Sequence, residues 1–222
     1  MTERMLVIAP HPDDEVLGAG GLIARTAAAG GSVLVAIVTK GMSPPFDPEL
    51  IATGRREAGE AHALLGVGET VFLDFPAAAL DTVAHRDLNA ALAELSRRFR
   101  PDTVLLPFPG DIHADHQLVF QSGLVACRPS ESWWPRRVMA YETLSETNWN
   151  APYLTPGFHP NLYVDIEAQL DTKLAAMERF ASQVRPFPHE RSVEALRALA
   201  ALRGATVGRR AAEAFVLVRG ME

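Results

Sequence analysis

The sequence predicts an α/β protein built on a mostly parallel sheet. Short apolar, β-branched runs alternate with segments whose apolar residues recur at helical spacing, and glycines and prolines separate many of them. Strand–helix–strand units of this kind make right-handed crossovers and so pair their strands in parallel. Two clusters of histidine and aspartate each follow an expected strand, at the sheet edge where such folds bind their ligands.

The first half of the chain contains four expected strands, with helices between them. Met5–Ala9 is a short apolar strand, and the helix after it ends at Gly30-Gly31, since glycine readily adopts the left-handed conformation of a helix terminus. Ser32–Thr39 is β-branched and uncharged, as in a buried strand, whereas Lys40–Asp47 is rich in Gly, Ser and Pro and reads as a loop. The expected elements are Met5–Ala9, Glu15–Ala29, Ser32–Thr39, Thr53–Leu65, Thr70–Leu73, Arg86–Phe99 and Thr103–Pro107.

The second half has fewer regular elements. Thr143–Pro160 contains prolines and asparagines without periodicity, so we expect a long ordered loop or lid, which in a compact domain is usually functional. No repeat, low-complexity tract or linker divides the chain, which predicts one domain over residues 1–222 with a C-terminal elaboration. The expected elements are Asp115–Cys127, Arg137–Tyr141, Leu162–Ile166, Glu167–Gln183, Ser192–Gly208 and Ala214–Val218.

Composition excludes several classes of protein. A net charge of −6 argues against a nucleic-acid partner, which would require a basic face. The single cysteine, Cys127, excludes an intramolecular disulfide and lies in an apolar helical context typical of a buried thiol. The N-terminus carries no basic-then-apolar leader, and no apolar run is long enough to cross a membrane. We therefore expect a cytoplasmic protein; whether it forms a homo-oligomer stays open.

The first cluster is a His-Pro-Asp-Asp-Glu motif that directly follows the first expected strand. His11 and Asp14 lie three residues apart, which lets both side chains reach one metal ion where a loop turns into a helix. Asp13 lies between them, placed to take a proton from water that the metal activates. The motif therefore offers two ligands and a general base.

The second cluster, His113-Ala114-Asp115-His116, follows the fourth expected strand. His116 opens a helix and is the expected third ligand. His113 is placed to stabilise an oxyanion or protonate a leaving amine, and Asp115 to orient either histidine. Either motif alone fits a helix N-cap equally well. Together they favour a catalytic zinc ion, which has three protein ligands and a position for water, and they predict hydrolysis of a carbonyl or phosphoryl compound.

These two motifs resemble those of the LmbE-like, PIG-L-type N-acetylglucosaminyl deacetylase family, which carries His-Pro-Asp-Asp-Glu and His-x-Asp-His at the same places. The resemblance extends over nearly the whole chain. Further matches, most of them to one branch of the family, are Arg56-Glu57-Ala58, Leu65-Gly66-Val67, Tyr141-Glu142, Thr147-Asn148-Trp149, Lys173, Ser182-Gln183, His189, Arg203-Gly204 and Ala212-Glu213-Ala214-Phe215.

The resemblance implies a Rossmann-like, three-layer α/β/α fold and one divalent metal ion per chain, usually zinc, held by His11, Asp14 and His116. It also implies that Asp13 is the general base and that His113 is the electrostatic or acid partner, held by Asp115. The reaction would remove acetyl from the 2-acetamido group of a sugar, giving a free amine and acetate. Since a His₂Asp site also accepts Fe²⁺, Co²⁺ or Mn²⁺, the native metal stays open.

Five further side chains are candidates for substrate contacts: Arg55, Arg56, Glu142, Trp149 and His189. Family members place an arginine of the second helix in the pocket, and either Arg55 or Arg56 can be its counterpart. Glu142 is a candidate for binding sugar hydroxyls, with a salt bridge to Arg136 or Arg137 as an equal rival. Trp149 offers a stacking surface for the sugar ring, and His189 is either a pocket residue or a surface-turn residue.

Two other functions stay open beside a deacetylase of a small N-acetylated sugar. One is a metal phosphoesterase, although such sites commonly bind two metal ions with more carboxylates than these clusters supply. The other is a non-catalytic protein of the same fold that binds metal or sugar. Asp13 and His113 argue against this second alternative, because neither is needed to hold zinc. The sequence leaves the aglycone of the substrate undetermined.

Overall fold

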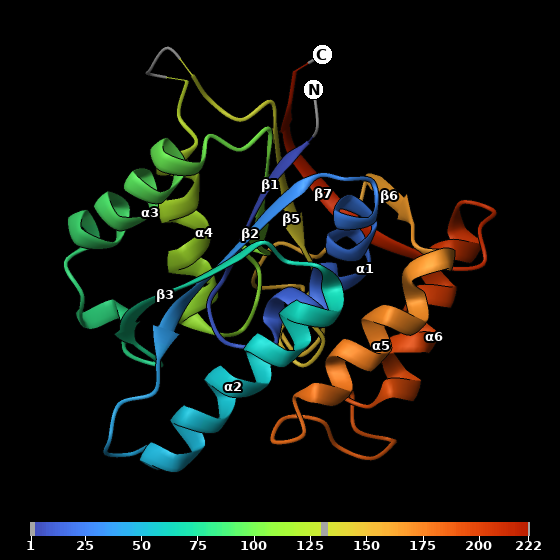
Figure 1. Cartoon of the computed structure of the whole chain (residues 1–222), viewed down its shortest axis with the longest axis horizontal. Helices are drawn as coiled ribbons and strands as arrows, with labels where there is room; N and C mark the ends of the chain where they lie inside the picture. The colour runs from blue at the N-terminus through green and yellow to red at the C-terminus, as the bar shows by residue number, and fades with distance from the viewer. Residues whose placement is uncertain (1–2, 130–132, 222) are drawn as a thin grey trace.

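One seven-stranded mixed sheet organises the chain (Figure 1). The computed structural model describes residues 3–129 and 133–221. The strands, in chain order, are β1 (Arg4–Ala9), β2 (Ser32–Lys40), β3 (Glu69–Pro76), β4 (Thr103–Pro107), β5 (Arg137–Tyr141), β6 (Leu162–Asp165) and β7 (Ala212–Gly220). Across the sheet their order is β3-β2-β1-β4-β5-β7-β6. Strands β1 to β5 pair in parallel, and β7 runs antiparallel between β5 and β6. The predicted mostly parallel sheet is confirmed.

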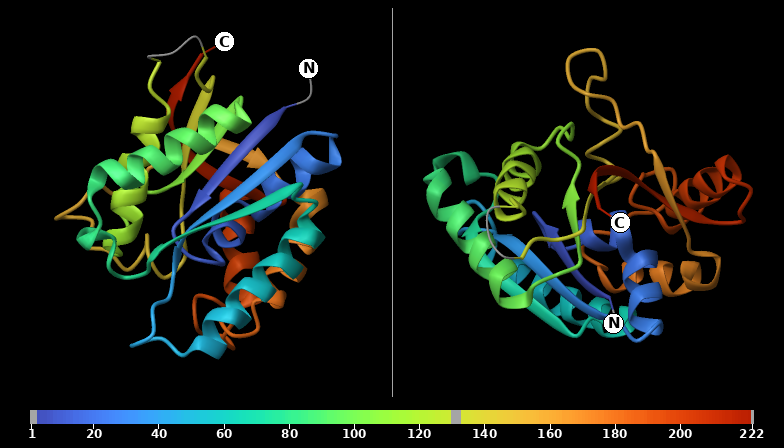
Figure 2. Two further views of the ribbon diagram at one scale, coloured as in Figure 1. Left: turned by 60° about the vertical axis from the view of Figure 1, so that its left-hand side comes forward. Right: turned by 90° about the horizontal axis from the view of Figure 1, so that it is seen from above.

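Helices cover both faces of the sheet and give the expected three layers (Figures 1 and 2). On one face lie α1 (Asp14–Ala28), α2 (Pro48–Leu65), α5 (Leu170–Arg179) and α6 (Val193–Thr206), and on the other α3 (His85–Phe99) and α4 (Ala114–Ala126). Alternate residues of each central strand face alternate layers: Val7 packs with α1, α2 and α5, whereas Leu6 and Ile8 pack with α3 and α4. Both faces are therefore buried, as continuous apolar strands require. No helix in the described part of the chain is long and apolar enough to cross a membrane.

The expected helix at residues 53–65 begins five residues earlier, at Pro48. The side chain of Asp47 caps it, because Oδ1 accepts the backbone N–H of Glu49 at 2.8 Å. Proline has no backbone N–H, and an N–H at the first helical position would have no partner within the helix, so Pro48 fits there. The loop after β2 is correspondingly short, and it leads directly into α2.

The expected helix over residues 167–183 begins with a 3₁₀ turn and ends four residues early. A short 3₁₀ helix, η2 (Glu167–Gln169), comes first, and α5 ends at Arg179. Phe180 is buried in the core, and Ser182 is tied to α2, since its Oγ donates to Oε2 of Glu57 at 2.6 Å and its N–H donates to Oε1 at 3.1 Å. These tertiary contacts end the helix, and apolar periodicity carries no sign of them.

The segment between β5 and β6 contains neither helix nor strand in the structure, as expected for residues 143–160. It packs on the loop that follows β4. The N–H of Ile112 donates to the carbonyl of Glu146 at 3.2 Å, and Thr147 Oγ1 donates to Oδ1 of Asp111 at 2.5 Å. The segment is thus held next to the ends of β1 and β4.

A buried ion pair joins the C-terminal elaboration to α1. Nζ of Lys173, on α5, lies 2.7 Å from Oε1 of Glu213, on β7. The same carboxylate accepts the backbone N–H groups of Gly21 and Leu22 in the middle of α1, at 2.8 and 2.7 Å. Lys173 also donates to the carbonyl of Leu17 at 2.9 Å. The pair therefore satisfies backbone groups of the helix whose first turn carries a predicted metal ligand.

We expect Glu213→Leu to lower the free energy of unfolding by about 3–5 kcal/mol, because it leaves a buried ammonium and two backbone N–H groups without their acceptor. The double variant Lys173→Met/Glu213→Leu should lose less than the sum of the two single variants, since no charge is left unpaired. Urea denaturation followed by far-ultraviolet circular dichroism measures both. A loss below 1 kcal/mol in Glu213→Leu would contradict this role.

Candidate metal centre and active site

Three predicted ligands meet at the carboxyl ends of β1 and β4. His11 and Asp14 come from the turn between β1 and α1, and His116 comes from the first turn of α4. Nδ1 of His11 and Nε2 of His116 lie 3.3 and 3.2 Å from the same atom, Oδ2 of Asp14. One ligand atom from each residue lies within 4.8 Å of the other two. The structure therefore brings these three side chains around one point.

Hydrogen bonds around the two histidines leave the inward-facing nitrogens free. Nδ1 of His116 is bonded to Oδ2 of Asp111 at 2.8 Å, while its buried Nε2 has no hydrogen-bond partner among the described residues. Nε2 of His11 is bonded to Oδ2 of Asp115 at 3.0 Å, which leaves Nδ1 facing Asp14. Carboxylates that bind the outer nitrogen in this way are typical of metal-ligating histidines. A buried unpaired nitrogen is costly, so these residues fit a divalent metal ion.

His11, His113 and Asp115 form a second group whose candidate ligand atoms lie within 4.8 Å of one another. Most of those atoms are already engaged. The carboxylate of Asp115 accepts the backbone N–H groups of Ala78 and Leu80 at 2.7 and 3.2 Å, in addition to His11. Nδ1 of His113 accepts the N–H of Asp115 at 3.1 Å. The group of His11, Asp14 and His116 is therefore the better candidate.

The structure corrects the expectation that Asp115 holds His113. The Asp115 carboxylate binds His11, and it lies 3.9 Å from Nδ1 of His113, too far for a hydrogen bond. His113 instead caps α4 through Nδ1, so in the neutral ring Nε2 carries the proton. Burial and the nearby His11 lower the pKa of His113, which favours that neutral ring. A His-x-Asp-His motif does not reveal which histidine its aspartate binds.

Asp13 adopts an unusual backbone conformation just before α1. Its φ of 105° lies in the left-handed region, which for residues other than glycine costs about 1–3 kcal/mol and persists only where the surroundings enforce it. Oε2 of Glu15 accepts the N–H of Asp13 at 3.3 Å. Behind Glu15, Nε2 of His62 lies 3.0 Å from Oε1, and Nδ1 of His62 lies 2.7 Å from Oγ1 of Thr70. A chain of side chains from β3 and α2 therefore holds this turn.

Arg191, which the sequence analysis missed, lies against Asp13. Nη1 of Arg191 lies 3.1 Å from Oδ2 of Asp13, Nε donates to Oγ of Ser145 at 2.9 Å, and Nη2 lies 3.6 Å from Oε1 of Glu146. Burial raises the pKa of Asp13 to about 8, against the opposing effect of the Arg191 charge. Arg191 stands in an irregular segment without periodicity, so its only sequence signal was its nearness to the family-like residue His189.

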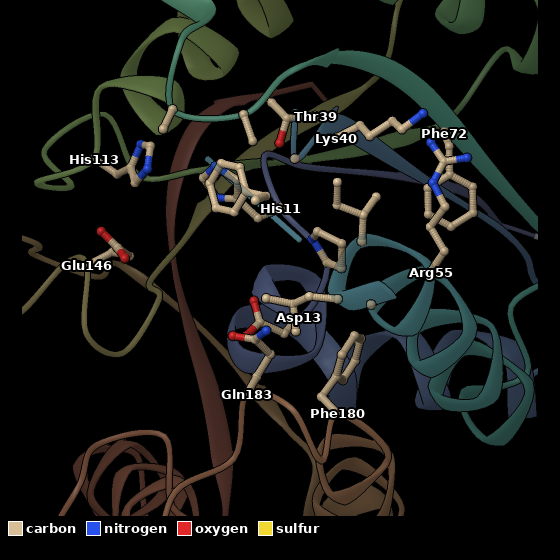
Figure 3. Close-up of a pocket in the computed structure, with 18 of the residues that line it drawn as sticks. His11, Asp13, Thr39, Lys40, Arg55, Phe72, His113, Glu146, Phe180 and Gln183 are labelled. Carbon is tan, nitrogen blue, oxygen red and sulfur yellow. The ribbon is translucent and has the colours of Figure 1, made fainter. Parts of the chain in front are cut away.

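One pocket of about 280 Å³ opens beside these groups. Figure 3 shows His11 and Asp13 facing it, with His113 and Glu146 on one side and Arg55 on the opposite side. The structure also decides between the two candidate arginines. Arg55 lines the pocket, whereas Arg56 points elsewhere: its side chain is 61% exposed and pairs with Glu60 at 2.7 Å.

Three expected substrate contacts lie outside the pocket lining. Both carboxylate oxygens of Glu142 accept hydrogen bonds from Arg203, at 2.8 and 2.6 Å, so a salt bridge satisfies this side chain. Trp149 is 55% exposed and packs edge-on against His189, with ring centroids 6.3 Å apart. Nδ1 of His189 accepts the backbone N–H of Arg191 at 3.0 Å. His189 therefore supports the turn that carries Arg191.

Comparison with known proteins agrees with this geometry. Residues 6–127 match the family described as PIG-L, GlcNAc-PI de-N-acetylase, which includes both histidine–aspartate motifs. The chain belongs to the PIG-L family.

Its relatives include deacetylases of carbohydrate substrates. The uncharacterized deacetylase YaiS of Escherichia coli is 30% identical over 187 residues, covering 80% of this chain and 90% of YaiS. The diacetylchitobiose deacetylase of Thermococcus kodakarensis is 29% identical over 227 residues, covering 99% of this chain and 84% of that protein.

Solved structures share the fold over its full length. A conserved protein of Thermus thermophilus has a TM-score of 0.80 at 31% identity, covering 100% of this chain and 97% of its own. The 4-carboxy-2-hydroxymuconate hydratase of Pseudomonas putida also has a TM-score of 0.80, at 24% identity, with 99% and 98% covered. At that identity the likeness shows the fold alone, so the activity must be argued from the site residues.

If His11, Asp14 and His116 bind zinc, we expect their affinity for zinc to rise with pH. Burial lowers the pKa of both histidines, but neighbouring carboxylates outweigh it: Asp115 and Asp14 raise the pKa of His11 to about 9, and Asp14 and Asp111 raise that of His116 to about 10. At neutral pH the metal-free protein therefore holds protons there that zinc must displace. We expect affinity to rise at least tenfold per pH unit between pH 6 and 8.

Isothermal titration calorimetry with zinc, run in buffers of different protonation enthalpy, measures both the affinity and the protons released. His116→Ala is the control and should bind zinc far more weakly at every pH. A zinc affinity that is independent of pH in the wild type would contradict the assignment of these two ligands.

Proposed function

We propose that the protein is a metal-dependent hydrolase that removes the N-acetyl group from an N-acetylglucosaminyl-type substrate. The observation that carries the proposal is the convergence of Nδ1 of His11 and the buried Nε2 of His116 on Oδ2 of Asp14, at 3.3 and 3.2 Å, next to a pocket that His11 and Asp13 line. Two ligand histidines with their outer nitrogens bonded, and a separate carboxylate at the same pocket, form the minimum set for metal-assisted hydrolysis. The deacetylase relatives support this choice of reaction.

His11, Asp14 and His116 would hold the metal ion, and their two nitrogens and one oxygen suit zinc, with Fe²⁺, Co²⁺ and Mn²⁺ as alternatives. When bound, the metal supplies a Lewis acid that lowers the pKa of water and polarises a carbonyl oxygen. Asp111 and Asp115 keep the outer nitrogens of the two histidines bonded, so both rings keep their orientation.

Asp13 moves the proton in this proposal. Its carboxylate takes the proton that water loses as the oxygen adds to the acetamide carbon. The same proton then passes to the amide nitrogen, so the C–N bond breaks with release of acetate and a free amine. Arg191 acts on this step because its charge favours the ionised form of Asp13. The left-handed turn at Asp13 fixes the direction in which the carboxylate approaches.

His113 stabilises the developing negative charge on the carbonyl oxygen. Its Nδ1 is occupied by the N–H of Asp115, so the neutral ring has Nε2–H as its donor. Fixed donors aimed at an oxyanion lower the barrier to acyl transfer by several kcal/mol. Glu146 and Gln183, on the same pocket wall, supply polar groups for sugar hydroxyls.

A phosphoesterase is the less well supported function for the same site. Such enzymes commonly place two metal ions within about 4 Å of each other. In the described ranges, one cluster keeps a ligand atom of each residue directed at a common point, whereas most of the nitrogen and carboxylate atoms of the second are engaged. The geometry therefore favours one ion and carbonyl chemistry.

Zinc-loaded protein is expected to release acetate from N-acetylglucosaminyl glycosides, and Asp13→Ala should lower kcat by about 10²–10⁴-fold with unchanged zinc content. The loss follows from removal of the only proton acceptor assigned to the step. A coupled acetate assay, appearance of a primary amine and metal analysis give the three readouts. Full activity in Asp13→Ala would sink the mechanism, and release of phosphate from phosphate monoesters without acetate release would establish the phosphoesterase instead.

Removal of Arg191 should shift the pH dependence of the reaction. Asp13 must be ionised to accept a proton, and the charge of Arg191 lowers its pKa. In Arg191→Ala the acidic limb of the kcat/KM profile therefore moves to higher pH, whereas Arg191→Lys keeps much of the wild-type profile. The matched control is Arg185→Ala, which removes an exposed guanidinium of the same segment; among the described residues this guanidinium bonds backbone carbonyls of residues 182 and 184. An unmoved acidic limb in Arg191→Ala would reject this role.

A further inference from the structure

The catalytic pocket has an apolar end that acetyl removal does not require. Beyond His11 and Asp13, the wall is built from the loop after β2, the first turns of α2 and the strand β3. Its apolar side chains are Phe46, Leu50, Ile51 and Phe72. In Figure 3, Phe72 and Arg55 lie across the pocket from His113 and Glu146, with His11 and Asp13 between the two sides. The part of the substrate that binds at this end is therefore not the reacting acetamide.

Three of these four side chains do not belong to the core, whereas Phe72 packs against its edge. Phe46, Leu50 and Ile51 belong to none of the apolar clusters formed by the described residues, and Leu50 is 46% exposed. Phe46 and Ile51 converge on Gly41, where a Cβ would lie 3.0 Å from Cγ of Phe46 and 3.1 Å from Cγ1 of Ile51. Both are thus packed on backbone at the pocket wall. Apolar side chains gathered in a pocket indicate a ligand with apolar surface to bury.

The two cations at this end suit an aromatic ring. The guanidinium of Arg55 lies over the ring of Phe72 at 4.6 Å and forms an ion pair with Asp74, so its charge is already balanced. Lys40 is half-buried and extends from β2 toward Arg55 and Phe72 in Figure 3, so its methylene stem forms part of the wall. Cations are attracted to the face of an aromatic ring. A ring therefore packs on the apolar wall and presents its face to Lys40, whereas Arg55 is already paired with Phe72 and Asp74.

We propose that this end of the pocket is a subsite for an aromatic aglycone on the N-acetylglucosaminyl substrate. The inference rests on the proposed function, because the acetamido group must lie at His11 and Asp13 for the aglycone to point toward α2. The ring then packs on Phe46 and Ile51, with Phe72 and Arg55 beyond it. Preference for aromatic over small aglycones is the property that distinguishes this subsite from an open, solvent-filled pocket.

Binding is measured first without catalysis. Methyl, cyclohexyl and phenyl 2-amino-2-deoxyglucosides, in both anomers, are product analogues that the zinc-loaded protein cannot deacetylate. Isothermal titration calorimetry should show the phenyl compound of one anomer binding at least tenfold more tightly than the methyl compound, equivalent to about 1.4 kcal/mol, with cyclohexyl between them. The kcat/KM values of the matching N-acetyl compounds should follow the same order.

Two substitutions locate the preference. Phe46→Ala and Ile51→Ala should each lower the phenyl-to-methyl affinity ratio to about threefold or less. The matched control is Leu202→Ala, which removes an exposed leucine (61% exposed) from α6, outside the pocket lining, and should keep the wild-type ratio. Phe46→Leu keeps an apolar side chain and should retain a larger ratio than Phe46→Ala.

Two results would overturn the proposal. The first is equal binding of the phenyl and methyl compounds in both anomers. The second is a 4-carboxyphenyl compound that binds at least tenfold more tightly than the phenyl compound and loses this gain in Lys40→Met, because this result would show an anion site. A different result would show that the proposed deacetylase reaction is wrong. If the zinc-loaded protein binds the phenyl compound with the expected ratio but releases no acetate from any N-acetyl compound, the deacetylase reaction is rejected and the subsite stands.

Discussion

The pairing of β1 with β4 is the constraint on which the site depends. Their parallel register, Met5 opposite Thr103 and Val7 opposite Leu105, brings both carboxyl ends to the same edge of the sheet. The turn after β1 and the helix start after β4 then face each other, so that residues far apart in sequence contact the same carboxylate oxygen of Asp14. A shift of register would separate the two histidines, since neither turn can reach across the sheet alone. Core packing on both faces of these strands therefore fixes the ligand geometry.

Around Asp14, the neighbours of each aspartate determine whether its carboxylate has a structural or a reactive role. Asp111 and Asp115 are bonded to imidazole nitrogens, and the charges of His116 and His11 hold the pKa of Asp14 well below its usual range, against the effect of burial. Asp13 differs, because burial dominates and raises its pKa, with Arg191 as its one cationic partner by direct contact. The four aspartates of the two facing turns thus have three different roles, set by their neighbours rather than by their residue type.

Sequence reasoning predicted what is local or periodic. Apolar runs gave the strands, and the two motifs marked the residues that meet at the sheet edge, because strand ends and motifs coincide. It failed where a partner stands in irregular backbone or far away in the sequence. Arg191 and Asp111 lie in loops, and Arg203 of α6, rather than Arg136 or Arg137, pairs with Glu142. The binding of Asp115 to His11 instead of His113 depends on how the two facing turns place their side chains in space, which no spacing rule contains.

The contact of Glu213 with the middle of α1 has a consequence for synthesis of the chain. The helix that follows the His-Pro-Asp-Asp motif is made first, but the carboxylate that accepts its Gly21 and Leu22 N–H groups is carried by the last strand. Arg191 also comes late. A nascent chain that has emerged through β4 and α4 therefore contains every proposed metal ligand but still lacks the groups that secure α1 and Asp13. The proposed site is therefore complete only after β7 has left the ribosome.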